Sequence, residues 1–279
     1  MERQTVSPND SGRSNLRRCV MQESMVRQQD EDFGKDYGLI HEAVVTGRKV
    51  GAGREFWTRL AHDEGLFGKV VSFVARGGFE PPTSQKRARE IMGKNFFGVE
   101  EAIKHFGVNP PRQQLAALSE IPFSEAVLEQ SKDTHVLVAV FPLSILEICG
   151  KVERKLFCSH EDAWYNKQSF AKERGEVTWQ LVHKTSVNNS TSKNWQEQQS
   201  LIAKDDEVPS AQVMVYTIIG HYLTTGERLF ETVYVRTSGV DSGGFRVGVG
   251  LFGSGGLGVF SDWDASRDGY LGVSSARKF

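Results

Sequence analysis

The sequence has few cysteines and no pairing pattern among them. Three cysteines occur in 279 residues, at Cys19, Cys149 and Cys158, and none forms a CxxC pair. An odd number of widely spaced cysteines argues against a disulfide framework and favours a reducing compartment. We therefore expect a cytoplasmic protein.

Long apolar segments are also missing. The longest apolar run, from Val136 to Ile148, is interrupted by Pro142, Ser144 and Glu147, whereas a membrane-spanning helix needs about 20 apolar residues. The N-terminal segment is polar and charged and lacks the apolar core of a secretory signal peptide. The sequence thus predicts no signal peptide and no membrane partner.

The sequence has almost no net charge, with 34 lysines and arginines against 35 aspartates and glutamates. This balance gives no overall field to attract nucleic acid, so a nucleic-acid partner is not expected. No HxxxH, HExxH or CxxC spacing occurs, and we expect no cofactor. The hydrophobic fraction of 39% and the charged fraction of 25% are ordinary for globular proteins, so the chain can form a packed core.

The chain changes character near residue 91. Residues 1–31 are polar and show no helical or strand period, and residues 33–74 are more apolar but irregular and interrupted by seven glycines. A polar composition buries too little apolar surface to offset the entropy of ordering. We therefore expect residues 1–91 to be a poorly ordered or spurious extension and residues 92–279 to form a single globular domain.

A short string lies between these two parts: Arg76-Gly77-Gly78-Phe79-Glu80-Pro81-Pro82-Thr83-Ser84. It resembles the translation of a transfer-RNA gene across its T arm, where GGTTCGA-type DNA reads Gly-Phe-Glu-Pro in one frame. The resemblance implies a reading frame extended upstream of the true start, for which Met92 is the candidate. An ordinary linker with Gly-Gly and Pro-Pro turns accounts for the same residues.

From Met92 onward, the pattern predicts an α+β domain with a helical N-terminal half. Amphipathic spacing and capping residues predict helices at 99–106, 110–118, 124–129, 144–150, 162–174 and 195–203. Two β-branched runs predict strands at 134–141 and 177–183. The apolar stripe over Ala211–Leu223 predicts a buried helix, although its β-branched residues leave a strand over Val213–Ile219 as an alternative.

The last 50 residues have the pattern of short strands separated by glycine turns. Alternating runs cover 232–236, 245–251, 257–260 and 270–274, and 11 of the 28 glycines lie between positions 239 and 272. This pattern predicts a glycine-rich antiparallel β-meander. We expect one face of it to pack on the helix at Ala211–Leu223.

Several phrases of the sequence resemble a group of uncharacterised proteins predicted from bacterial genomes. They are Ser190–Lys193 (STSK), Trp195–Gln198 (WQEQ), Thr225–Phe230 (TGERLF) and the ending Ser274–Lys278 (SSARK). The resemblance spans residues 92–279 and implies a real bacterial domain there. It implies no activity.

One cluster has the residue types that hydrolases use. Cys158, His160 and Asp162 precede a predicted helix, with Glu161 among them, and His183 ends the following strand. A histidine can lower the pKa of a thiol and so activate it as a nucleophile, and imidazole and carboxylate groups serve acid–base chemistry or metal binding. As a structural alternative, Asp162 is a natural N-cap of the predicted helix.

A second pattern, Asp264-x-Ser266-x-Asp268-Gly269, matches the first six positions of a calcium-binding loop. The twelfth position should be a glutamate but is Ser275, and the flanking runs predict strands where that motif has helices. An Asp-Gly hairpin turn explains the same residues. We therefore expect no metal to bind there.

Two further features are weaker. The glycine-rich run Gly253–Gly258 precedes a strand, whereas a phosphate-binding loop precedes a helix. Aromatic and arginine side chains share the C-terminal segment and could stack bases or another polymer, but aspartates in the same segment oppose a basic field. No convergent catalytic set emerges, so we expect a non-catalytic binding or interaction module. The alternative is a hydrolase that uses Cys158, His160, Asp162 and His183.

Overall fold

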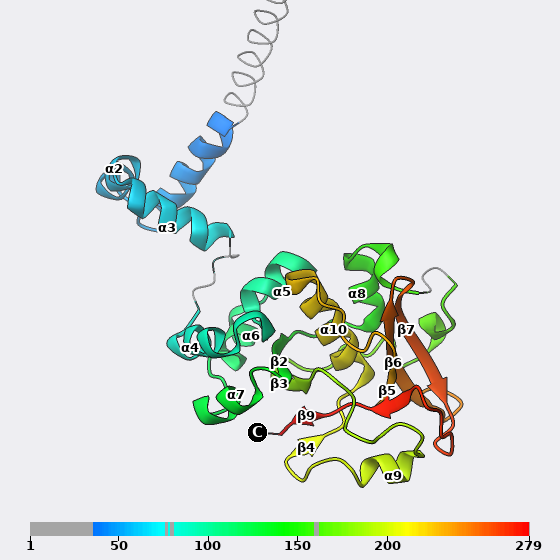
Figure 1. Cartoon of the computed structure of the whole chain (residues 1–279). Coiled ribbons are helices and arrows are strands. Elements are labelled where there is room, and N and C mark those ends of the chain that lie inside the picture. Colours follow the sequence, from blue (N-terminus) through cyan, green and yellow to red (C-terminus); the bar gives the residue numbers. More distant parts are fainter. Residues whose placement is uncertain (1–35, 76–77, 79–80, 159–161, 279) are drawn as a thin grey trace, which may run out of the picture. The chain divides into compact units, whose positions relative to one another are not determined.

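The computed structural model describes residues 36–75, 78, 81–158 and 162–278 (Figure 1). The chain divides into two compact units, with the boundary between Val71 and Ser72. Helices and mixed sheets occur together, so the expected α+β class is confirmed. No helix in the described ranges is both long and apolar enough to cross a bilayer.

The described part of the first unit consists of helices that bury little of their surface. It is helical at 36–49, in α2 (Arg54–His62) and in the greater part of α3 (Glu64–Ala75), which crosses the boundary between the units. None of residues 36–71 is buried, and side chains such as Tyr37 and Val50 are more than half exposed. Short helices depend on burying an apolar face for their stability, and these helices lack such burial.

The second unit includes a helix that precedes Met92. Helix α4 (Thr83–Met92) packs against α7 (Glu125–Ser131) and buries Gln85, Ala88, Ile91 and Met92. Gln85 Nε2 donates to the carbonyl of Leu118 at 2.7 Å. The packed unit therefore extends N-terminally beyond residues 92–279. The sequence pattern missed this helix because its buried stripe begins with a polar glutamine.

The remaining helices of this unit are short and locally specified. They are η1 (Gly93–Asn95), α5 (Val99–Phe106), α6 (Arg112–Ala117), α8 (Ile145–Lys151), η2 (Arg154–Leu156) and α9 (Trp195–Gln199). The capping box of α8 forms as the sequence indicates: Glu147 N donates to Ser144 Oγ, and Ser144 N donates to the Glu147 carboxylate at 2.8 Å. Such reciprocal bonds satisfy two backbone donors that have no partner within the helix.

One expected helix does not form. Over 162–174 the structure has only the 3₁₀ turn η3 (Trp164–Lys167), followed by further turns. Trp164 Nε1 donates to the carbonyl of Val259 at 2.9 Å, and Phe170 and Ala171 are buried. These tertiary contacts override the helical propensity of the segment.

The first sheet has five strands in the order β1-β2-β3-β9-β4. They are β1 (Phe96–Phe97), β2 (His135–Val140), β3 (Thr178–His183), β9 (Ala276–Arg277) and β4 (Asp206–Glu207). β1 runs parallel to β2, and the other neighbours are antiparallel. Only β2 and β3 were predicted, because the other three strands have two residues each and show no period.

The second sheet has four strands in the order β7-β6-β5-β8. β5 (Tyr234–Val240), β6 (Arg246–Gly253) and β7 (Gly256–Asp262) are successive antiparallel neighbours, but β8 (Leu271–Val273) runs parallel to β5. The predicted antiparallel meander is thus wrong for its last strand, β8, which is parallel to its neighbour. Polar contacts hold β8 in place: Gln198 Nε2 donates to the carbonyl of Leu271, and Val273 N donates to Ser190 Oγ.

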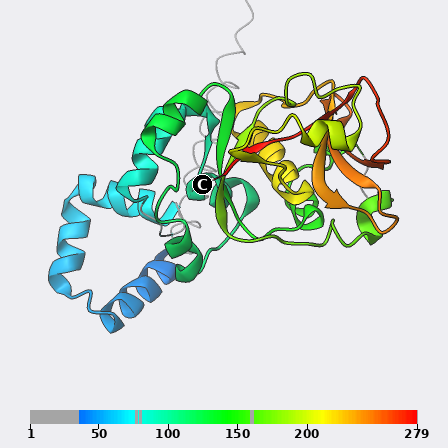
Figure 2. The same ribbon diagram turned by 90° about the horizontal axis from the view of Figure 1, so that it is seen from below.

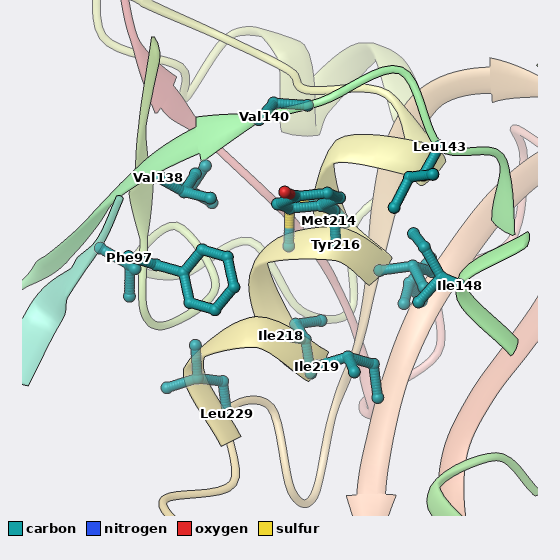
Figure 3. Close-up of a cluster of buried hydrophobic side chains, with 14 of the residues drawn as sticks. Phe97, Val138, Val140, Leu143, Ile148, Met214, Tyr216, Ile218, Ile219 and Leu229 are labelled. Atoms are coloured by element: carbon teal, nitrogen blue, oxygen red, sulfur yellow. The ribbon is translucent and has the colours of Figure 1, made fainter. Parts of the chain in front are cut away.

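Helix α10 (Ala211–Thr225) lies between the two sheets. It contacts β1 and β2 on one side and β5 and β6 on the other, an arrangement that both views show (Figures 1 and 2). Met214, Tyr216, Ile218 and Ile219 of α10 are fully buried, and Figure 3 shows them in one hydrophobic cluster with side chains from β1, β2 and α8. The stripe over Ala211–Leu223 is therefore helical, and the alternative of a strand over Val213–Ile219 is excluded.

Candidate functional site

Cys158 lies beside the four-stranded sheet. Its backbone N donates to the carbonyl of Leu257 at 3.0 Å, next to an isolated parallel bridge between Phe157 and Leu257. The thiol is exposed and unpaired. Asp162 is exposed in a turn. His160 and Glu161 lie outside the described residues.

His183 lies in the other sheet, across α10 from the strands that Cys158 joins. It ends β3, where it pairs with His135 of β2, and the two imidazole ring centroids are 4.6 Å apart. His183 Nδ1 lies 3.1 Å from Thr185 Oγ1. The structure thus brings His183 together with a histidine that the sequence did not single out, and leaves Cys158 with other neighbours.

The surroundings of the two histidines disfavour their charged forms. Burial, followed by the neighbouring His183 and Arg277, lowers the pKa of His135 to about 4, and burial also lowers the pKa of His183. Arg277 itself lies 3.5 Å from Asp205 and 3.6 Å from Asp206. Both imidazoles are therefore neutral near pH 7.

The Asp264–Gly269 loop is held by an arginine. Arg236 of β5 is fully buried, and its guanidinium donates to the carbonyls of Trp263 and Ser266, to that of Lys193 and to Gln198 Oε1, over 2.8 to 3.2 Å. A planar guanidinium with several fixed donors suits such a cluster of acceptors. This contact ties the STSK and WQEQ phrases to the C-terminal segment, a role that the sequence did not suggest.

In the same loop, Asp264 bonds through its carboxylate and Asp268 through its backbone. Asp264 accepts two hydrogen bonds from Arg246, each at 3.1 Å, and Asp268 contributes a backbone carbonyl to Ser192 N. Within the described part of the chain, no three His, Cys, Asp or Glu side chains are grouped closely enough to share a metal ion. The cation that pairs with Asp264 in this loop is thus the guanidinium of Arg246.

Calcium is therefore expected to have no measurable effect on stability. A loose site with millimolar affinity gains only RT ln(1 + [L]/Kd), which is a few tenths of a kcal/mol at about 1 mM calcium. The melting temperature should be equal in calcium and in EDTA, for the wild-type chain and for Asp264→Asn. A rise of several degrees with calcium that Asp264→Asn abolishes would show a true metal site.

A second polar cluster closes the C-terminal end of α10. Glu227 lies 2.8 Å from Lys94 and 2.9 Å from Lys184, and these bonds lower the pKa of Glu227 to about 2. The buried His221 lies 3.5 Å from the same carboxylate, and burial lowers its pKa. The cluster joins the segment after α10 to η1 and to the end of β3, which gives Glu227 of the TGERLF phrase a structural role.

The outer face of the four-stranded sheet carries a strip of half-buried aromatic and arginine side chains. We define this aromatic strip as Tyr234, Phe260, Arg246 and Trp195. The Tyr234 and Phe260 ring centroids are 4.1 Å apart, and the Arg246 guanidinium lies 4.2 Å from the Trp195 ring centroid. β6 and β7 place Phe260 and Arg246 on the same face, because Gly248 pairs with Phe260 and lies two residues from Arg246.

Glycines make room for this strip. A Cβ atom at Gly248 would lie 2.0 Å from the Phe260 ring, and one at Gly258 would lie 2.4 Å from the Tyr234 hydroxyl. The rings therefore lean directly over backbone, which explains why glycines recur in these strands. Cys158 and Tyr270 lie near the Tyr234 hydroxyl, whose pKa is raised first by burial and then by these two groups.

Compared with known proteins, the chain matches no family model, no curated protein and no solved structure.

Proposed function

We propose that the chain is a non-catalytic binding module and that it binds through the aromatic strip. The observation that carries the proposal is the Tyr234–Phe260 ring pair, which stays partly open to solvent on the outer face of a sheet whose inner face is buried. Partly exposed aromatic rings offer a large, rigid contact area and are a common feature of ligand-binding surfaces.

The charges around the strip favour an uncharged ligand. Arg246 is paired with Asp264, and Arg267 with Glu197 at 2.9 Å. Binding of a nucleic acid depends on cations that neutralise phosphates, and these two arginines are already neutralised. Sugar rings present apolar C–H faces that pack on aromatic rings, and their hydroxyls can donate to carboxylates such as Asp264. We therefore propose a neutral glycan as the ligand.

The alternative of a hydrolase needs Cys158 and His183 in one site. His183 belongs to the five-stranded sheet, whereas Cys158 lies beside the four-stranded sheet on the other side of α10. A general base must lie within hydrogen-bond reach of the group that it activates. The described residues thus support binding in preference to thiol chemistry at this pair.

Substitution of the two rings tests whether the aromatic strip binds glycans. In native gels cast with starch, laminarin, mannan, xylan or hydroxyethyl cellulose, the wild-type chain should be retarded by at least one polymer. Tyr234→Ala and Phe260→Ala should each weaken that retardation about tenfold, which corresponds to about 1.4 kcal/mol. Trp263→Ala is the matched control, because Trp263 is 65% exposed but lies outside the strip.

Three results would contradict the proposal. One is retardation by none of the neutral polymers. A second is binding to poly(dT) in their place, which would reverse the choice of an uncharged ligand. The third is equal loss of binding in Trp263→Ala and Tyr234→Ala, with melting temperatures unchanged, which would move the binding surface away from the strip.

A further inference from the structure

The paired histidines His135 and His183 lie in a geometry that suits a shared ligand. Lys184 N donates to the carbonyl of Thr134 at 2.8 Å, which places a hydrogen-bonded pair one residue beyond the end of the β2–β3 ladder, whereas His183 N donates to the carbonyl of Ser275 and so points away from His135. Such pairs alternate along antiparallel strands, and the next pair, His135 and His183, is of the non-hydrogen-bonded kind. Side chains approach each other most closely at pairs of that kind.

Threonines hold one nitrogen of each imidazole. His135 Nδ1 lies 2.8 Å from Thr134 Oγ1, and His183 Nδ1 lies 3.1 Å from Thr185 Oγ1. The Thr185 amide, which can donate to His183 Nδ1, and the Thr185 carbonyl, which can accept from it, both lie 3.2 Å away. The tautomer that donates from Nδ1 leaves Nε2 as the ligand atom. Both side chains are only partly buried, so an ion has access to the pair from solvent.

From this geometry we infer that His135 and His183 form a two-histidine chelate for a divalent transition metal ion such as Ni²⁺, Cu²⁺ or Zn²⁺. Imidazole nitrogen suits these borderline ions, whereas Ca²⁺ and Mg²⁺ prefer oxygen. Water completes the coordination, since no third histidine, cysteine, aspartate or glutamate of the described chain is grouped with the pair. The positive charge of Arg277 is offset by Asp205 and Asp206.

The chelate is tested on the full chain by titration with NiCl₂ in a calorimeter at pH 7.5. The wild-type chain should bind one Ni²⁺ at this site, and His135→Gln and His183→Gln should each reduce the affinity at least tenfold. His105→Gln is the matched control: His105 is a partly buried histidine on α5 that lies apart from the pair, and its loss should leave the affinity unchanged.

A second measurement separates the chelate from a folding effect. Melting temperatures in EDTA report whether each variant is folded, and Ni²⁺ should raise the melting temperature of the wild-type chain and of His105→Gln only. Wild-type affinity in both His135→Gln and His183→Gln would overturn the inference. A loss of Ni²⁺ affinity in only one of the two variants would also overturn it, because the ion would then have a single histidine ligand. So would the absence of Ni²⁺ binding by the wild-type chain. If either variant is unfolded in EDTA, NMR of the wild-type chain replaces the comparison. Broadening of both Nε2 resonances by Ni²⁺ would support the chelate, and broadening of one or neither would overturn it.

Discussion

An Ile218→Asp variant is expected to lose its folded structure. Ile218 is fully buried in α10, between the two sheets, and belongs to the hydrophobic cluster of Figure 3. A carboxylate at this position would be buried in the hydrophobic core, and burying an unpaired charge costs several kcal/mol. That cost is comparable to the 5–15 kcal/mol by which a typical domain is stable.

The measurement is thermal unfolding followed by circular dichroism, with Ile218→Val as the control. Removing one methylene group should cost only about 1 kcal/mol and leave a cooperative transition. An Ile218→Asp protein that is soluble and melts at the wild-type temperature would contradict the placement of α10 at the centre of the core.

The second large effect is on stability, and it is expected to depend on whether a shortened chain keeps α4. A chain that begins at Pro81 keeps α4 and should retain the full unfolding transition of the second unit. A chain that begins at Met92 loses the buried Ala88 and Ile91 and the bond from Gln85 to Leu118. By analogy with core truncations, this loss should cost on the order of 3–5 kcal/mol.

The comparison also tests the origin of the N-terminal segment. We propose that residues 1–80 contribute nothing to the stability of the second unit, in keeping with the resemblance of residues 76–84 to a translated transfer-RNA gene. Denaturant unfolding of the two shortened chains and the full chain would measure both effects. If the chains that begin at Pro81 and at Met92 are equally stable, α4 does not stabilise the second unit. If the chain that begins at Pro81 is less stable than the full chain, residues 1–80 do contribute to that stability, contrary to the proposal.

Local signals in the sequence identified most of the elements near the centre of the fold. The Ser144–Glu147 capping box depends on residues three positions apart, and the stripe of α10 depends on a period within a single helix. Both could be predicted because the interactions that specify them are local. The helix predicted over 162–174 does not form for the opposite reason, because the contact of Trp164 with Val259 joins residues far apart in the chain.

The candidate sites were harder to predict, because strand pairing creates them. His183 was singled out with Cys158, which is closer in the sequence, whereas the structure pairs it with His135. One signal was available: His135 lies near the start of one predicted strand and His183 at the end of the next, so antiparallel pairing would place them opposite each other. The role of Arg236 had no such signal, because its acceptors come from two segments, residues 193–198 and 263–266, that lie far from it in the sequence.

The most direct test of the proposed binding surface is an NMR titration of the tryptophan indole N–H signals with the glycan that retards the chain. Trp195 lies in the aromatic strip, whereas Trp179 is buried and donates to the carbonyl of Leu118, and Trp57 lies in the first unit. Binding at the strip should shift the Trp195 signal and leave those of Trp179 and Trp57 in place. An unchanged Trp195 signal at saturating glycan, or equal shifts of all three signals, would contradict the account.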